Sequence, residues 1–246
     1  MRTIAIFNQK GGVGKTTTAV NLAAGLSRMD KKVILVDLDP QGNINVALRV
    51  KSEYDLYDAI IGRIGIKSCV VNLAKNLDVI TSRETLVKAE HLLIKNNQPI
   101  MLKNILGQID GYDYMIIDCP PSLSILNQNV LSFCKEVFVP VASDFLGLDA
   151  LRKTSEIVNE ICKAYNAQVK ITKVIPTMFD RRSNICKNIL ATIQQEFPEV
   201  TSYPINMNSK LKEAPMKGMS IFAYAKSSSG AKDYGKLVED TAAMIA

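Results

Sequence analysis

The sequence predicts an α/β fold, a doubly wound, mostly parallel sheet with helices on both faces, formed as a single domain by residues 1–246. Two observations predict it. Short runs of Val, Ile and Leu without polar alternation are typical of strands that helices cover on both faces. These runs alternate with longer segments of helical spacing over short connections, as in parallel β–α–β units. No internal repeat or Pro/Gly-rich linker divides the chain.

The first half of the expected order begins with a strand, Arg2–Asn8, and a helix, Thr16–Met29, in which small and apolar residues recur at helical spacing. Further apolar runs predict strands at Lys32–Asp37, Leu77–Thr81 and Tyr114–Asp118. The middle of the chain, Lys51–Gln108, which includes the run Leu77–Thr81, carries no assignable motif. We expect helices and a strand there, and part of a partner surface.

The second half continues the alternation. Two more apolar runs predict strands at Val137–Val141 and Val169–Ile175. The most loop-like stretch of the chain is Lys226–Gly230, because it is rich in Ser and ends in Gly. We expect it to precede a C-terminal helix, Ala231–Ile245.

Composition excludes several classes of protein. No run of about 18 apolar residues predicts a membrane-spanning helix, and the N-terminus lacks the apolar core of a signal peptide. Five scattered Cys and one His indicate neither a disulfide framework nor a zinc site. We therefore expect a cytoplasmic protein in a reducing environment.

The positive charge is unevenly distributed. The net charge is +6, yet residues 1–150 hold 16 basic and 15 acidic side chains, and residues 151–246 hold 14 basic and 9 acidic ones. A basic excess concentrated in one part of a chain favours an anionic partner. The alternative is a solvated surface with surplus Lys.

The strongest chemical signal is the glycine-rich segment Gln9–Thr17, QKGGVGKTT, between a predicted strand and a predicted helix. Glycines let backbone N–H groups surround a phosphate, and the helix N-terminus adds its positive dipole end. In this loop Lys15 supplies a charge for the β- and γ-phosphates, and the Thr16 hydroxyl is placed to bind Mg²⁺. The common pattern GxxxxGK[ST] is not met strictly, because Gln9 stands where its first glycine belongs, and a second lysine, Lys10, follows. The alternative is a glycine-rich turn without a chemical role.

Acidic residues end two predicted strands, at the edge where open α/β sheets bind ligands. Asp118 follows YMII, the pattern of a Walker B acid that holds Mg²⁺ through water. Asp37 and Asp39 flank Leu38, and Asp39 is either a hydrolytic acid or a turn-former before Pro40. We expect Cys119 to be a small buried residue and no nucleophile.

KGGVGKTT resembles the deviant Walker A motif of the ParA/MinD group of P-loop ATPases. The resemblance implies an ATP- and Mg²⁺-dependent homodimer in which Lys10 reaches the partner's phosphates. It implies that Lys10, Lys15 and Asp39 are catalytic, with Asp39 positioning the attacking water. The expected nucleotide-binding residues in this loop are Lys10, Gly11, Gly12, Val13, Gly14, Lys15, Thr16 and Thr17, and the expected magnesium-site residues are Thr16 and Asp118.

Two further segments favour the partition branch of this group. Each resembles a sequence pattern of partition ATPases: the segments are Thr177–Asn184, TMFDRRSN, and Ile205–Gly218, INMNSKLKEAPMKG. By position, Arg182 and Lys210 match residues that bind DNA nonspecifically, with Lys210 standing where Arg is usual. Asn206, Met207 and Asn208 match the base-contacting segment, although Asn206 replaces the usual Pro. A solvated basic face is the alternative for these cations.

The predicted function is that of an ATPase that positions DNA or other cargo. ATP binding would drive dimerisation and nonspecific binding to double-stranded DNA, and a ParB-like or other adaptor would stimulate slow hydrolysis and release. We expect the protein in the cytoplasm on the nucleoid, without a membrane partner. The alternatives are a MinD-like membrane-positioned ATPase, a nucleotide switch in which hydrolysis is incidental, and a metabolic P-loop enzyme.

Overall fold

The computed structural model describes residues 1–96, 98 and 100–244. Its centre is a seven-stranded sheet in the order β3-β4-β2-β5-β1-β6-β7. The strands are β1 (Arg2–Ile6), β2 (Val33–Asp37), β3 (Val70–Ala74), β4 (Leu77–Ile80), β5 (Tyr114–Asp118), β6 (Glu136–Ala142) and β7 (Lys170–Thr177). Every neighbouring pair is parallel except β3 and β4. The prediction of a doubly wound, mostly parallel sheet is confirmed.

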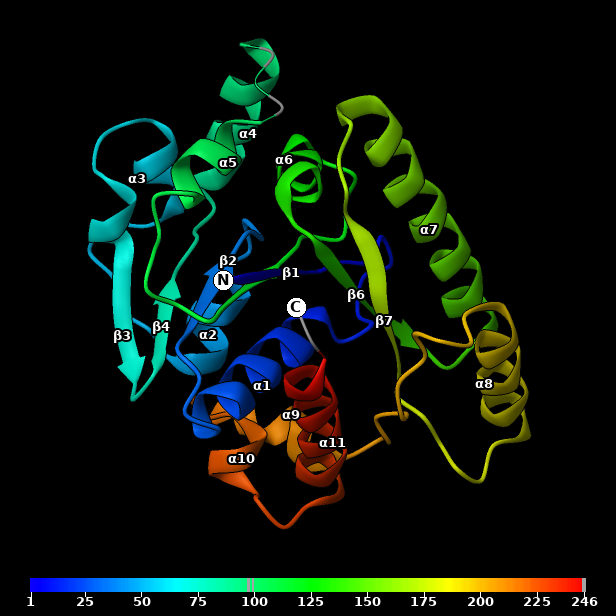
Figure 1. The fold of residues 1–246 in the computed structure, drawn as a ribbon. Coiled ribbons are helices and arrows are strands. Elements are labelled where there is room, and N and C mark those ends of the chain that lie inside the picture. Colours follow the sequence, from blue (N-terminus) through cyan, green and yellow to red (C-terminus); the bar gives the residue numbers. More distant parts are fainter. Residues whose placement is uncertain (97, 99, 245–246) are drawn as a thin grey trace.

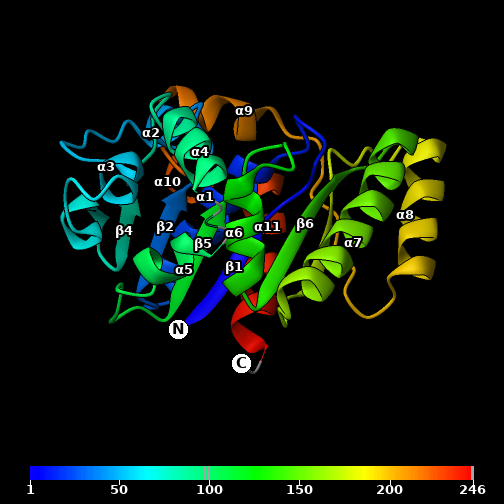
Figure 2. The ribbon, with the colours of Figure 1, turned by 90° about the horizontal axis from the view of Figure 1, so that it is seen from above.

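Helices cover both faces of the sheet (Figures 1 and 2). One face packs against α3 (Leu56–Ile60), α4 (Leu86–Lys95), α5 (Met101–Leu106), α6 (Ile125–Phe133), α7 (Phe145–Tyr165) and α8 (Asn184–Glu196). The other face packs against α1 (Lys15–Arg28), α2 (Asn43–Leu48), α9 (Ser209–Met216), α10 (Ile221–Tyr224) and α11 (Ser229–Ala243). A short 3-10 helix, Ile66–Cys69, leads into β3.

Strands β1, β2 and β5 form the centre of the sheet because almost every side chain on them is apolar and buried. Their register aligns Asp37 and Ile6 with Asp118, so the carboxyl ends of all three strands meet at one edge. The loops that follow these ends therefore converge, which brings the glycine-rich segment and the acidic strand ends together.

Six of the seven strands coincide with the predicted apolar runs to within two residues at each end. The sequence prediction missed β3, whose side chains are half-buried or exposed, because an antiparallel edge strand lacks a continuous apolar run. The last helix starts at Ser229, so part of the predicted loop Lys226–Gly230 is helical. Ile245, the predicted end of that helix, lies outside the described residues.

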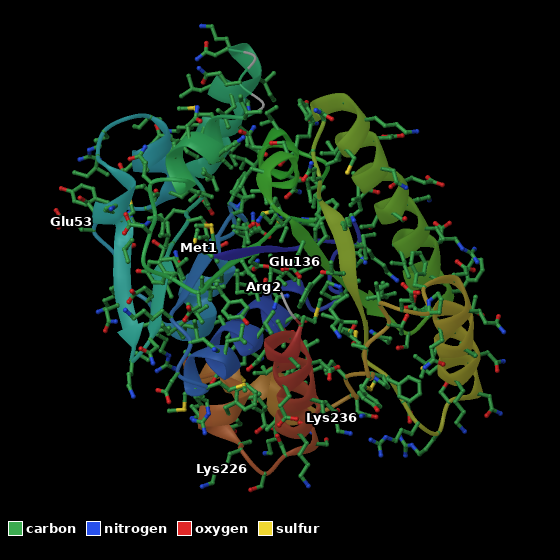
Figure 3. The ribbon with its side chains drawn as sticks, in the orientation of Figure 1. Met1, Arg2, Glu53, Glu136, Lys226 and Lys236 are labelled. Atoms are coloured by element: carbon green, nitrogen blue, oxygen red, sulfur yellow. The ribbon has the colours of Figure 1, made fainter. Side chains whose placement is uncertain are left out.

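At the opposite edge of the sheet, Arg2 joins β1 to β6 and to the end of α11 (Figure 3). Its guanidinium donates to both carboxylate oxygens of Glu136, at 2.8 and 2.7 Å, and to the backbone oxygen of Thr241 at 2.6 Å. The hydrogen bonds to Glu136 raise the pKa of Arg2 above its ordinary value, although burial of the guanidinium acts in the opposite direction. A basin of about 1300 Å³ opens beside this pair, but it contains none of the predicted functional residues.

Candidate nucleotide-binding site

The glycine-rich segment forms a tight loop between β1 and α1. Gly12 and Gly14 have φ angles of 72° and 91°, a left-handed conformation that a side chain would disfavour. Helix α1 begins at Lys15 with no side chain capping its first turn, so its N–H groups face the loop. Backbone donors at a helix N-terminus are suited to phosphate oxygens.

Two buried polar side chains hold this loop in place. Asn8 is fully buried, donates from Nδ2 to the Pro140 oxygen at 2.8 Å, and accepts the Lys10 N–H at 2.9 Å. On the other side, the Thr177 hydroxyl donates to the Val13 oxygen at 2.8 Å. The loop is therefore anchored to β6 and β7 before any ligand binds, which lowers the entropy cost of ordering it around a phosphate.

The two loop lysines occupy different environments. Lys15 is buried, which lowers the pKa of its ammonium group, and its Nζ donates to the Lys10 oxygen at 3.0 Å. Lys10 Nζ instead forms an ion pair with Asp144 Oδ1 at 2.9 Å, within the same chain. Partial burial works against the charge of Asp144, but the Lys10 hydrogen bond and the Gly147 N–H hold the pKa of Asp144 below its ordinary value.

The acids at the strand ends are deeply buried. Asp118 is 1% exposed, and neither of its carboxylate oxygens has a hydrogen-bond partner among the described residues. Burial, and then the neighbouring Asp37, raise its pKa well above the ordinary value. Asp37 accepts the N–H groups of Asp39 and Ile44 at 3.0 and 3.1 Å and so shapes the following loop. Cys119 is buried, as predicted, and burial raises the pKa of its thiol.

Asp39 lies in the loop between β2 and α2, with its carboxylate at the cavity. Oδ1 accepts the Gln41 N–H at 2.9 Å, and Oδ2 lies 3.4 Å from Asn43 Nδ2. The Ser82 hydroxyl donates to the Asp39 backbone oxygen. The side chain is thus oriented by its own turn, as the interpretation of a turn-former predicted, and Ser82 holds the backbone of the loop. The role of Asp39 in hydrolysis stays a prediction.

Of these groups, Lys15 and Asp39 line a cavity of about 560 Å³ at the carboxyl edge of the sheet. The walls come from the loop, from the segment after β2, and from residues near the ends of β5, β7 and α9. The lining residues are Gly11, Gly12, Gly14, Lys15, Thr16, Thr17, Asp39, Gln41, Asn43, Val46, Ala47, Pro121, Met178 and Pro215.

The predicted base-contacting residues lie around a neighbouring hollow. Asn206 and Met207 line a space of about 400 Å³ with Phe179 and Arg182, whereas Met178 lines the main cavity. The Asn206 amide is already paired, since Oδ1 accepts from Arg181 at 2.9 Å and Nδ2 donates to Asp233 at 2.8 Å. Asn208 caps α9 by accepting the Lys210 N–H at 2.8 Å.

The two predicted DNA-contact residues each have an acidic neighbour. Arg182 Nε lies 3.2 Å from Asp180 Oδ1, and Lys210 Nζ lies 2.8 Å from Glu213 Oε2. Both ion pairs are exposed, so each contributes little to the free energy of folding. A phosphate group could therefore replace the carboxylate as the partner of the cation.

Sequence reasoning missed three residues that shape the site: Asn8, Asp144 and Thr177. Each acts on the loop from 130 or more residues away or through backbone atoms, as the Lys10–Asp144 and Thr177–Val13 contacts illustrate. The only signal was position, because Asn8 ends the first apolar run and Thr177 opens the TMFDRRSN segment.

A parallel sheet with a glycine-rich loop entering a helix, Lys15 on that helix and buried acids on adjacent strand ends defines a P-loop nucleotide-binding protein. Comparison with known proteins agrees. Residues 1–171 match the family described as AAA domain. The chromosome-partitioning ATPase Soj of Treponema pallidum is 35% identical over 246 residues, covering 98% of this chain and 97% of the relative.

Solved structures extend the likeness. Apo McdA from Cyanthece superimposes with a TM-score of 0.88 at 26% identity, covering 98% of this chain and 99% of that one. Cobyrinic acid a,c-diamide synthase from Mycobacterium smegmatis, with bound ATP analog and magnesium, has a TM-score of 0.84 at 26% identity, covering 98% and 94%. The chain belongs to the ParA/Soj family of partition ATPases.

Proposed function

We propose that this protein is an ATP-dependent partition ATPase that positions DNA or another cargo. The observation that carries the proposal is the convergence of three separate parts of the chain on one site. Lys15 and Asp39 line the cavity, Lys10 belongs to the same loop as Lys15, and Asp118 lies buried close to Lys15 and Asp39. A partition ATPase needs those four functions together: phosphate binding, a dimer contact, water positioning and metal binding.

The residues present fit a magnesium ion. Two unpartnered carboxylate oxygens on a fully buried Asp118 would be costly without a cation or water to bind them. No group of three or more His, Cys, Asp or Glu in the described part of the chain could hold a metal alone. Magnesium often binds through few protein ligands together with phosphate oxygens and water, so Thr16 and Asp118 suffice here. The ion would neutralise charge on the phosphate oxygens.

The remaining chemistry belongs to side chains of this chain. Lys15 would move from the Lys10 oxygen to the β- and γ-phosphates, which accept its charge more strongly. Asp39 would orient the attacking water, because its carboxylate faces the cavity from a loop that Asp37 and Ser82 hold. ATP would lie with its phosphates on Gly11–Thr17 and its base toward Asn206–Asn208.

Four exposed apolar side chains support an ATP-dependent homodimer, because one lines the cavity and the others are close in sequence to residues of the site. Val46 is 72% exposed and lines the cavity. Leu123 and Met216 are exposed and come shortly after two prolines that line it. Phe145 is exposed and follows Asp144, the ion-pair partner of Lys10. Large exposed apolar groups near a charged cleft are typical of a surface that a protein covers. A second copy placed there would bring its Lys10 toward the nucleotide of the first.

The basic C-terminal region supports DNA binding without base readout. Its cations are exposed and lie on α8, α9, α11 and the connecting loops. Figure 3 shows Lys226 and Lys236 beside α10 and α11. The set comprises Arg181, Arg182, Lys187, Lys210, Lys212, Lys217, Lys226, Lys232 and Lys236. Exposed Lys and Arg suit phosphate backbones, and two copies in a dimer would raise avidity.

The structure gives less support to a MinD-like membrane function. Tyr234, Leu237 and Val238 place the apolar side of α11 in the core against α1, which leaves no apolar face for a membrane surface. In the described part of the chain no helix is sufficiently long and apolar to cross a bilayer. We propose instead a cytoplasmic, nucleoid-associated protein whose slow hydrolysis a ParB-like or other adaptor stimulates.

The decisive experiment measures binding of a nonspecific duplex at two salt concentrations with ATP, ADP or no nucleotide. We expect tight binding only with ATP and Mg²⁺, falling steeply with salt. Lys15→Gln should abolish nucleotide binding, and Arg182→Ala combined with Lys210→Ala should weaken DNA binding equally for all sequences. Sequence-selective or nucleotide-independent binding would contradict the proposal.

A further inference from the structure

Arg49 ends the helix that follows Asp39 in an unfavourable backbone conformation. It is the residue after α2, with φ of 52° and ψ of 40° in the left-handed region. Residues with a Cβ avoid that region, and they persist there where surrounding contacts hold them. We therefore expect contacts of the Arg49 side chain to hold the residue in this conformation.

The Arg49 side chain reaches across to α9. Its Nη2 donates to the backbone oxygen of Met216 at 2.7 Å, and Met216 is the last residue of α9. Carbonyl groups at a helix C-terminus lack partners within the helix and carry the negative end of its dipole, so they accept readily from a guanidinium.

Packing adds a second contact between the same two elements. Gly218, two residues beyond α9, has φ of 71°, and a Cβ on it would lie 2.8 Å from Cγ and Cδ of Arg49. The absence of a side chain at Gly218 thus provides the space in which the Arg49 stem crosses the chain after α9. Arg49 is both bonded to this turn and packed against it.

Both helices reach the nucleotide cavity. Val46 and Ala47 of α2 and Pro215 of α9 line it, and α9 also carries Lys210. Arg49 connects the two helices at their C-terminal ends, outside the cavity. A ligand that orders the Asp39 loop and α2 would therefore act on α9 through this connection.

We propose that Arg49 is a positioning residue that couples the nucleotide-dependent loop and α2 to the basic helix α9. Through it, nucleotide binding would set the position from which Lys210 meets a DNA phosphate. This inference rests on the proposed function, because DNA binding by α9 is part of that function.

The test is Arg49→Gly, because glycine suits the left-handed backbone and relief of that strain offsets the greater freedom that glycine gives the unfolded chain, so the fold should form as in wild type. Hydrogen exchange is measured with and without a non-hydrolysable ATP analogue and Mg²⁺, in the absence of DNA. In wild type we expect slower exchange in both α2 and α9. In Arg49→Gly the analogue should still slow exchange in α2 but leave α9 unchanged.

A second measurement compares DNA affinity with the analogue and with ADP. The ratio of the two affinities should fall about fivefold in Arg49→Gly, the change expected for loss of one hydrogen bond, and Arg49→Lys should restore part of it. Lys51→Ala is the matched control. Lys51 is exposed, carries the same charge two residues away and makes no ion pair in the described part of the chain.

Retention of the α9 response in Arg49→Gly, or its absence in wild type, would overturn the coupling. An equal loss in Lys51→Ala would assign the effect to charge alone. If wild-type DNA affinity does not depend on ATP, the proposed function fails, and the exchange experiment still decides the role of Arg49.

Discussion

Replacing Asp144 should strengthen the ATP-dependent dimer. In the free chain Lys10 is paired with Asp144, and the two side chains are 27% and 55% exposed. An exposed ion pair of this kind contributes about 0.5 kcal/mol. If Lys10 must leave Asp144 to reach a partner's phosphates, forming a dimer breaks two such pairs, which costs about 1 kcal/mol. Removing the carboxylate charge should therefore lower the dimer dissociation constant about fivefold.

The choice of substitution separates the ion pair from helix capping. Asp144 Oδ1 also accepts the Gly147 N–H at 2.6 Å and so caps α7. Asn caps helices as well as Asp, whereas Ala loses about 1 kcal/mol. Asp144→Asn should tighten the dimer without lowering the melting temperature, and Asp144→Ala should tighten it with a lower melting temperature.

Sedimentation velocity with a non-hydrolysable ATP analogue would measure the dimer constant. Asp149→Asn is the matched control, because Asp149 pairs with Lys153 on the same helix at 2.8 Å, and its loss also removes one negative charge. An unchanged or weaker dimer in Asp144→Asn, or an equal gain in Asp149→Asn, would refute the reasoning that Lys10 is held by Asp144.

Three further changes test other parts of the structure. Arg2→Ala should lower the free energy of unfolding by about 3 kcal/mol, because it leaves the largely buried Glu136 carboxylate without its cation. Lys75→Ala breaks a largely exposed ion pair with Asp30 and should change the free energy of unfolding by less than about 0.5 kcal/mol; urea titration measures both. Gly25→Ala should destabilise the protein by about 1–3 kcal/mol despite the helical preference for Ala, since the new Cβ would lie 2.3 Å from Val238 Cγ2, and a higher melting temperature would contradict that. Asp39→Ala should slow ATP hydrolysis at least about 100-fold while leaving ATP affinity within about twofold, and unchanged turnover would remove this residue from the mechanism.

Much of the fold was predictable because its signals are local. Strands covered on both faces must be apolar along their whole length, so β1, β2 and β5 stand out in the sequence. The edge strand β3 has no such requirement, since its side chains are partly solvated, and no pattern marked it. That the chain forms one domain over residues 1–246 stays a prediction.

The candidate site likewise has residues that local sequence patterns predict and residues that they do not. The sequence by itself determined the phosphate loop and the acids at the strand ends, because glycine spacing and a carboxylate after an apolar run are features of neighbouring residues. Only the tertiary structure decided that Asn8 and Thr177 anchor the loop, that Lys10 pairs with Asp144 and that Arg49 reaches Met216. Those contacts join residues more than 130 positions apart through single side chains, and chain-distant contacts of this kind exist only after the sheet and its helices have packed.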